Sequence, residues 1–102
     1  MCNLYSFRKS PEEVKALFDY PEQPNFPPRD VVAPGQPIAI VKGEKTIRHF
    51  ALVRWGFVPS WTKEMKAGKP LTNARSETVF EKPSFRHAIR RRRCLIPADG
   101  FY

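Results

Sequence analysis

Cysteine is scarce in this sequence, because only Cys2 and Cys94 occur among 102 residues. A small secreted protein that depends on disulfides needs more of them, so the count argues against a disulfide scaffold. The two histidines, His49 and His87, do not complete a metal site, since the four side chains lack the closely spaced ligand pairs that zinc sites use. We therefore expect no metal and no cofactor.

Long apolar runs are also missing. No stretch is apolar enough to span a bilayer, and the amino terminus lacks the basic segment and apolar run of a secretory signal. The sequence therefore predicts a cytoplasmic protein without a membrane-spanning segment.

Acidic residues are outnumbered, with ten Asp and Glu against eighteen Lys and Arg and a net charge of +8. Such an excess favours a polyanionic partner, either nucleic acid or an acidic membrane surface.

The residues that are present suffice for one small domain. Hydrophobic residues make up 41% of the chain and aromatic residues 13%, which supports a folded core. A chain of this length buries somewhat more than ~60% of its extended surface, so its independent stability is marginal. Eleven prolines predict many loops and short elements.

Local signals predict where those elements lie. Ser10, Pro11 and Glu13 form the capping box and first turn of a helix that ends near Tyr20. The apolar face of this helix is expected to be core: Val14, Leu17 and Phe18. The other expected elements are strands at 31–32, 38–41, 46–55 and 94–96, a charged hairpin tip at 42–45, and a second helix capped by Ser84.

The position of Cys2 suggests a reactive terminus. Removal of Met1 would leave one residue that carries both a free α-amine and a thiol. Such an aminothiol condenses with an aldehyde to an imine, and its thiolate then closes a five-membered thiazolidine ring. Reference pKa values of roughly 7.7–8.0 for the amine and roughly 8.5 for the thiol leave both groups partly nucleophilic near neutral pH. The alternative is an incidental cysteine at a frayed chain end.

Cations and aromatic rings are interleaved between residues 54 and 69. Single-stranded nucleic acid is bound by such a mixture, because cations such as Arg54 follow the phosphates and rings such as Trp61 stack on bases for roughly 1–3 kcal/mol each. Trp55 and Phe57 stand at the end of a predicted strand, where a place in the core is the favoured interpretation.

Two further groups of polar residues could contact nucleic acid. The arginines at positions 90–93 could bind phosphates or form a solvated helix end that complements the helix dipole. Asn73 and Arg75 would share a face of a strand and could grip a phosphate or sugar oxygen. The alternative for Arg75 is a surface salt bridge to a glutamate. His49 and His87 have no hydrolase-like neighbours in the sequence, so we expect surface or core histidines.

Five blocks of sequence occur in order along the chain: Met1-Cys2, Val32–Gln36, Arg54–Trp61, Asn73–Thr78 and Arg92–Tyr102. Together they resemble the SOS response-associated peptidase family of abasic-site-processing proteins. The resemblance covers the whole chain in the family's order. It implies an α+β domain with a mostly antiparallel, strongly curved or barrel-like sheet and a few short helices, of which residues 1–102 supply the amino-terminal half.

The resemblance also implies a function in DNA damage. Family members bind single-stranded DNA and form a covalent cross-link to abasic sites, here through Cys2 as the catalytic residue. Asn73 and Arg75 match the family's DNA-contacting residues, with Trp61 as a stacking or wedging ring and Arg54 as a further cation. Lyase activity and an autoproteolytic peptidase activity, which would remove Met1, are attributed to the family. The implied partner is single-stranded DNA with abasic sites, and no membrane.

The sequence departs from the family in two ways. Asn3-Leu4 follows Cys2 where many members have a Gly-Arg pair. Family domains are also about twice as long, and beyond Tyr102 they continue with a catalytic glutamate and a later histidine. We therefore expect the sheet to be completed by that second half or by self-association. Two other readings stay open: a non-catalytic basic module for single-stranded DNA, and an inert truncated fragment.

Overall fold

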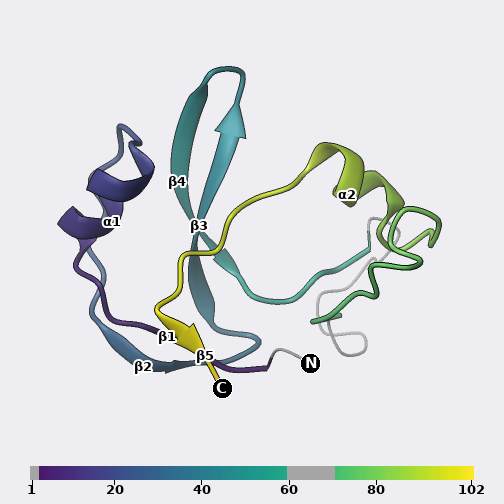
Figure 1. Ribbon diagram of the computed structural model, residues 1–102, viewed down its shortest axis with the longest axis horizontal. Coiled ribbons are helices and arrows are strands. Elements are labelled where there is room, and N and C mark those ends of the chain that lie inside the picture. The colour runs from purple at the N-terminus through teal and green to yellow at the C-terminus, as the bar shows by residue number, and fades with distance from the viewer. Residues whose placement is uncertain (1–2, 60–70) are drawn as a thin grey trace.

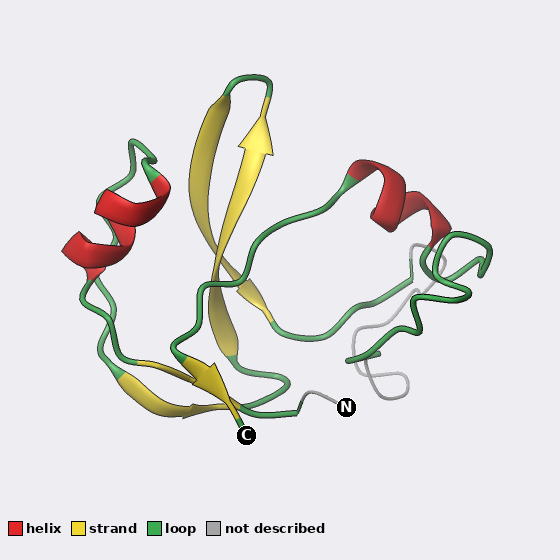
Figure 2. Cartoon of the chain, in the orientation of Figure 1, coloured by secondary structure: helices red, strands yellow, loops and turns green. Residues whose placement is uncertain are grey.

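A computed structural model describes residues 3–59 and 71–102 of the chain (Figure 1). Its elements are β1 (Tyr5–Phe7), α1 (Pro11–Phe18), β2 (Arg29–Val32), β3 (Pro37–Glu44), β4 (Ile47–Arg54), α2 (Arg86–Arg91) and β5 (Gly100–Phe101). Every strand pairing among them is antiparallel, and the helices are short (Figure 2). The predicted α+β class is therefore confirmed. None of these helices is long and apolar enough to cross a membrane.

The strands form two sheets in the described residues, with the orders β2-β1-β5 and β3-β4. In the first sheet Tyr5 is paired with Val32 on one side and with Phe101 on the other. This sheet therefore brings the amino-terminal strand and the end of the chain side by side, as the ribbon shows (Figure 1).

The expected barrel-like closure is not supported by residues 3–59 and 71–102, because neither sheet is closed. The predicted strand at 94–96 is reduced to an isolated bridge, in which Val41 and Leu95 exchange main-chain hydrogen bonds of 2.9 Å. Pro97 follows directly and has no N–H with which to extend the ladder.

The hairpin of β3 and β4 is longer than predicted. Its ladder runs from Pro37 opposite Arg54 to Glu44 opposite Ile47, so residues 42–44 belong to β3 and do not form the tip. The chain turns at Lys45, whose φ is +58°. The predicted strand at 46–55 corresponds to β4 and is confirmed within a residue at each end.

Helix α1 begins as the sequence predicts. Ser10 accepts a hydrogen bond from the Glu13 N–H over 3.2 Å, and the Glu13 carboxylate accepts one from the Ser10 N–H over 3.2 Å. Val14 is fully buried on the inner face, but Leu17 is 62% exposed, so its predicted place in the core is wrong. The helix is only eight residues long, and Leu17 lies in its last turn.

Helix α2 begins differently from the prediction. Its N-cap is Phe85, and no side chain hydrogen-bonds to the cap, so Ser84 does not cap this helix. Three preceding hydrogen-bonded turns, including Phe85 N–H to the Lys82 carbonyl at 3.0 Å, lead the chain into the helix instead.

The core lies where the first sheet, α1 and the hairpin meet. Its buried members come from these three parts and, with Tyr20, from the loop after α1: Tyr5, Phe7, Val14, Tyr20, Val32, Ile38, Ala39, Ile40 and Val41. Residues 38–41 are buried in succession, which shows that both faces of β3 are covered at this point.

The proline-rich loop after α1 is held against this core by aromatic contacts. Ring centroids of Phe26 lie 5.3 Å from Phe7 and 5.8 Å from Phe50, and Tyr20 lies 5.3 Å from Phe50. The loop therefore adds rings to the core between β1 and β4, although it contains no regular element.

Candidate functional site

The amino end of β1 lies beside the end of the chain. Tyr102 N–H donates to the Leu4 carbonyl over 3.2 Å, and Asp99 N–H donates to the Ser6 carbonyl over 2.8 Å. Cys2 precedes Leu4 by two residues and lies outside the described residues. Its predicted catalytic role therefore stays a prediction.

Trp55 packs against β1. Its ring centroid lies 5.4 Å from that of Tyr5 at a tilt of 51°. Its main chain exchanges hydrogen bonds with the turn before β3, since Gly35 N–H donates to the Trp55 carbonyl at 2.8 Å and Trp55 N–H to the Gln36 carbonyl at 3.0 Å. Gly35 has a φ of +88°, a conformation that favours glycine. Trp55 therefore contacts both β1 and the turn before β3, which agrees with its interpretation as a core residue.

The segment that begins at Leu71 also lies near Tyr5 and Trp55. Leu71 exchanges main-chain hydrogen bonds of 2.7 and 3.0 Å with Phe57. Thr72 then lines a hollow of about 250 Å³ together with Tyr5 and Trp55. Ile96, Ala98 and Phe101 complete its lining. Segments that are far apart in the sequence therefore converge on the amino end of β1.

Asn73 follows Thr72 directly and is held by it. The Asn73 amide Nδ2 donates to the Thr72 Oγ1 over 3.2 Å, while the Asn73 side chain stays exposed. Residues 72–75 are not in a strand, so the expected shared face of Asn73 and Arg75 does not arise from strand geometry. The turns that follow begin with Thr78 N–H donating to the Arg75 carbonyl at 3.2 Å.

Arg75 is exposed, and within residues 3–59 and 71–102 no carboxylate lies within ion-pair distance of it. The alternative of a salt bridge to a glutamate therefore has no support in this part of the chain. Arg54, the last residue of β4, is exposed and stands opposite Pro37 in the ladder. Trp61 lies outside the described residues, so its stacking role stays a prediction. The assignment of Asn73, Arg75 and Arg54 to DNA binding is likewise untested by the geometry.

His49 has a partner that the sequence did not indicate. Its Nδ1 lies 2.7 Å from Oε2 of Glu22, and the other carboxylate oxygen accepts the Phe50 N–H over 2.9 Å. These hydrogen bonds, with the one from His49 first, lower the pKa of the Glu22 carboxyl to about 2. The pair ties the loop after α1 to β4, and this supports a structural role for His49.

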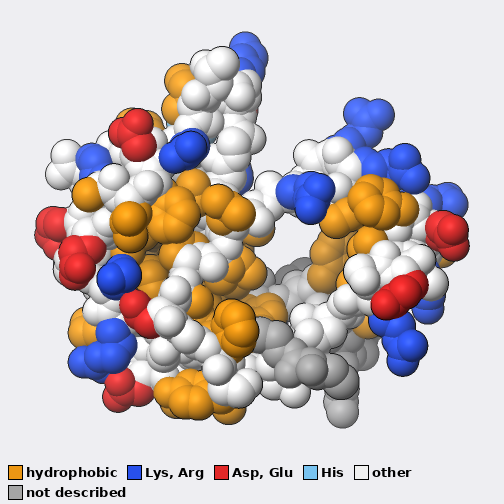
Figure 3. All heavy atoms as spheres, viewed as in Figure 1, with side chains coloured by type: hydrophobic (Ala, Val, Ile, Leu, Met, Phe, Trp, Pro, Cys, Tyr) orange, Lys and Arg blue, Asp and Glu red, His pale blue; other side chains and the backbone are white. Residues whose placement is uncertain are grey.

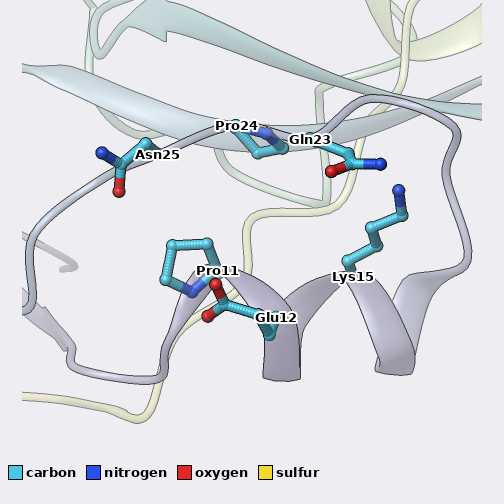
Figure 4. A pocket seen from close by; sticks show the side chains of 6 residues that line it. All are labelled: Pro11, Glu12, Lys15, Gln23, Pro24 and Asn25. Atoms are coloured by element: carbon cyan, nitrogen blue, oxygen red, sulfur yellow. The ribbon is translucent and has the colours of Figure 1, made fainter.

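A separate crevice lies between α1 and the loop that follows it (Figure 4). Its volume is about 260 Å³, and Glu12 and Lys15 project into it from α1 opposite Gln23 and Asn25. Lys15 also reaches the Pro21 carbonyl at 3.4 Å. The mixed charges suit water rather than a polyanion. In the described residues, no three His, Cys, Asp or Glu side chains converge on a point that could hold a metal.

Sequence reasoning missed Tyr5 and Thr72 as members of the site. Tyr5 shows only as one aromatic residue near the terminus, and β1 has three residues, too few for a periodic pattern. Thr72 stands directly before the Asn73–Thr78 block, and this adjacency was the available signal.

The comparison with known sequences identifies a family. The sequence profile of the SOS response associated peptidase (SRAP) family matches residues 1–102. The chain therefore belongs to this family.

Individual relatives are similar over the whole chain or part of it. The abasic site processing protein YoaM of Bacillus subtilis is 34% identical over 105 residues, which cover 100% of this chain and 46% of the relative. The mouse abasic site processing protein HMCES is 50% identical over 54 residues, which cover 49% of this chain and 15% of that protein.

A crystal structure of a protein from Bordetella bronchiseptica has the same fold. It superposes with a TM-score of 0.76 at 30% identity, over 99% of this chain and 50% of that protein. The chain thus spans about half the length of the full-length relatives it matches, at 46% of YoaM and 50% of the crystal structure.

Proposed function

We propose that this protein processes abasic sites in single-stranded DNA and links itself to them covalently through Cys2. The relatives named abasic site processing proteins support the DNA-damage role. The observation that carries the chemical part is the arrangement at the amino end of β1. Tyr102 donates to the carbonyl of Leu4, which is two residues from Cys2 in the sequence, and Thr72 lines a hollow with the neighbouring Tyr5.

The chemistry follows from the terminal aminothiol. Once Met1 is cleaved, by the family's autoproteolytic activity or by an aminopeptidase, the Cys2 α-amine attacks the open-chain aldehyde of the abasic sugar. Loss of water gives an imine, and the Cys2 sulfur adds to the imine carbon while the nitrogen takes up a proton. The product is a thiazolidine ring in which the aldehyde carbon is bonded to both nitrogen and sulfur. Lyase action would proceed from the same imine: a base takes the proton from C2′, the 3′ phosphate leaves with the downstream strand, and water then hydrolyses the imine to release the protein.

Arg75 and Asn73 position the strand in this proposal. Arg75 is exposed, and its planar fork suits a phosphate. Asn73 is oriented by Thr72, whose hydroxyl accepts from Nδ2 at 3.2 Å. Arg54 and Trp61 add a further phosphate contact and a stacking ring.

In a full-length domain, the second half of the chain would continue from Tyr102 beside the amino end of β1. The ladder from Tyr5 opposite Phe101 continues with the hydrogen bond from Tyr102 to Leu4. A residue that follows Tyr102 would therefore lie next to the chain that leads to Cys2. Family members continue beyond this block with a catalytic glutamate, which in this proposal would lie next to that chain and assist the proton transfers. The protein would act in the cytoplasm at lesions in the nucleoid.

Mass spectrometry after incubation with an abasic oligonucleotide tests the proposal. We expect an adduct whose mass equals protein without Met1 plus DNA minus one water. Cys2→Ser should give only an imine that needs borohydride to survive, because oxygen closes the ring less durably. Cys94→Ala is the matched control, since Cys94 is a free and exposed cysteine away from β1, and it should keep the adduct.

An adduct that survives Cys2→Ala without borohydride would refute the mechanism. Salt-dependent binding without any adduct would identify a non-catalytic DNA-binding module instead.

A further inference from the structure

Two hollows on the α2 side of the molecule meet at Arg93 and Cys94. The first has a volume of about 340 Å³ and is lined by Phe57, Phe85, Ile89 and Arg92 as well as the shared pair. The second, of about 370 Å³, lies against β3 and is lined by Val41, Lys42 and Leu95 with the same pair. No Asp or Glu lines either hollow in the described part of the chain.

The arginines at the end of α2 differ in their surroundings. Arg90 is engaged within the chain, because its guanidinium lies 5.5 Å from the Phe80 ring centroid and donates to the Phe80 carbonyl over 3.2 Å. Arg92 and Arg93 are exposed at the lining of the hollows. Arg90 therefore has a partner within the chain, whereas Arg92 and Arg93 border open space.

The first hollow has the composition of a site for unpaired bases. The rings of Phe57 and Phe85 lie 5.4 Å apart at a tilt of 51° and form an apolar wall. Lysine and arginine side chains gather around α2 next to apolar side chains that face the open centre of the molecule (Figure 3). Bases stack on such rings while cations follow the phosphates.

The hollows are connected to the candidate site through the main chain. Phe57 lines the first hollow and exchanges two hydrogen bonds with Leu71, which precedes Thr72 and Asn73. The segment that carries Thr72 and Asn73 is therefore joined by main-chain hydrogen bonds to a residue of the first hollow.

We propose that Lys42, Arg92 and Arg93 form a phosphate track for the DNA strand that flanks the lesion, with Phe57 and Phe85 as its stacking wall. This inference rests on the proposed function, because it assumes a single strand at the amino end of β1. A protein segment is the other occupant that an apolar wall could take, but the lining holds four cations and no carboxylate, which favours a polyanion. The fourth cation, Arg48, is engaged within the chain, because its guanidinium donates to the Phe18 carbonyl over 3.1 Å.

The test removes two positive charges from the proposed track. It uses the whole protein that the gene encodes. The double variant Arg92→Gln/Arg93→Gln is titrated by fluorescence anisotropy against an oligonucleotide of about 15 nucleotides that carries a non-reactive abasic analogue, at several salt concentrations. We expect roughly tenfold weaker binding and a salt slope smaller by about 1.4, since each phosphate contact on a single strand contributes about 0.7. A trinucleotide centred on the lesion should lose much less, because it does not reach the track.

The matched control is Arg90→Gln/Arg91→Gln. It removes the same charge from the same helix, at residues that line neither hollow, and should weaken binding less than about twofold. Equal losses of DNA affinity in the two double variants would show that only the total charge of the protein matters, and this would overturn the proposed track. Unchanged DNA affinity together with a lower unfolding midpoint would overturn it in favour of a protein occupant.

Adduct formation separates the two proposals. If the parent protein forms the Cys2 adduct while Arg92→Gln/Arg93→Gln binds the long strand normally, the track fails and the proposed function stands. If the parent forms no adduct but the salt slope changes as expected, the covalent function fails and the track stands.

Discussion

Tyr102 N–H donates to the Leu4 carbonyl over 3.2 Å, and this hydrogen bond joins the two ends of the described chain. It continues the antiparallel ladder in which Tyr5 is opposite Phe101. The block that ends at Tyr102 is therefore held next to the segment that leads to Cys2. The block at residues 92–102 belongs to the family pattern, and this hydrogen bond holds its end beside the residues that follow Cys2.

The hydroxyl of Thr72 should matter because it orients Asn73. Thr72→Val keeps the shape of the side chain but removes the acceptor of the 3.2 Å hydrogen bond. Loss of one such bond is worth about 0.5–1.5 kcal/mol, so we expect adduct formation to slow roughly threefold to tenfold at subsaturating DNA. Quenched time courses measure the rate.

The control for this change is Thr78→Val, because within the described residues Thr78 makes its hydrogen bonds through its main chain. A similar loss of rate in Thr78→Val, or an unchanged rate in Thr72→Val, would contradict the positioning role.

Arg75→Ala should weaken single-stranded DNA binding. Arg75 is exposed, and no carboxylate of the described residues lies within ion-pair distance, so its charge is available to a phosphate. We expect the salt slope to fall by about 0.7, as for one phosphate contact, while the unfolding midpoint stays unchanged. The exposed Lys9 offers a matched control, and Lys9→Ala should leave the slope as it is. The same slope in both variants would argue against Arg75 as a contact.

Ser10, the N-cap of α1, should contribute more to the free energy of unfolding than Ser84, which precedes α2. Ser10 accepts the Glu13 N–H, whereas α2 has no side-chain cap. We expect Ser10→Ala to lower the free energy of unfolding by about 1 kcal/mol, and Ser84→Ala to change it by less than about 0.5 kcal/mol. Urea denaturation of both variants measures the difference. Equal effects would show that the capping box is not formed in solution.

Acid should remove the contribution of Glu22 to stability. Its carboxyl has a pKa lowered from 4.5 to about 2, first by the hydrogen bond to His49 and then by that from the Phe50 N–H. Because the pKa is lower in the folded state, folding favours the ionised form. The stabilisation is therefore present above pH 4.5 and is lost as the pH falls from 4.5 towards about 2.

The variant Glu22→Gln tests this pH dependence by thermal unfolding. It should be less stable than the parent at pH 7, and the difference should shrink below pH 4.5. The exposed Glu81 serves as the control, and Glu81→Gln should show no such convergence. A difference that stays constant across this range would contradict the assigned hydrogen bonds.

Local rules account for the elements that were predicted correctly. The Ser10 capping box, the proline breaks after Tyr20 and the apolar residues of β3 and β4 act through neighbours in the chain or through its periodicity. Two predictions failed because neighbouring residues outweigh the signal on which each was based. Ser84 precedes α2 without capping it, since a preceding turn leads into the helix, and residues 94–96 form only one bridge, since Pro97 has no N–H to extend the ladder.

Sequence patterns were sufficient to predict the α+β class, the capped helix, the hairpin strands, and a family identity that rests on ordered blocks of residues. Propensities, caps and motifs are properties of short segments, so they can be recognised before the fold is known. The three-dimensional contacts were needed to show that Tyr5, Trp55 and Thr72 line one hollow. They were also needed to show that Tyr102 is hydrogen-bonded to Leu4 and that Glu22 is the partner of His49. Those contacts join residues far apart in the chain, and they are set by strand register and ring packing, which no local pattern encodes.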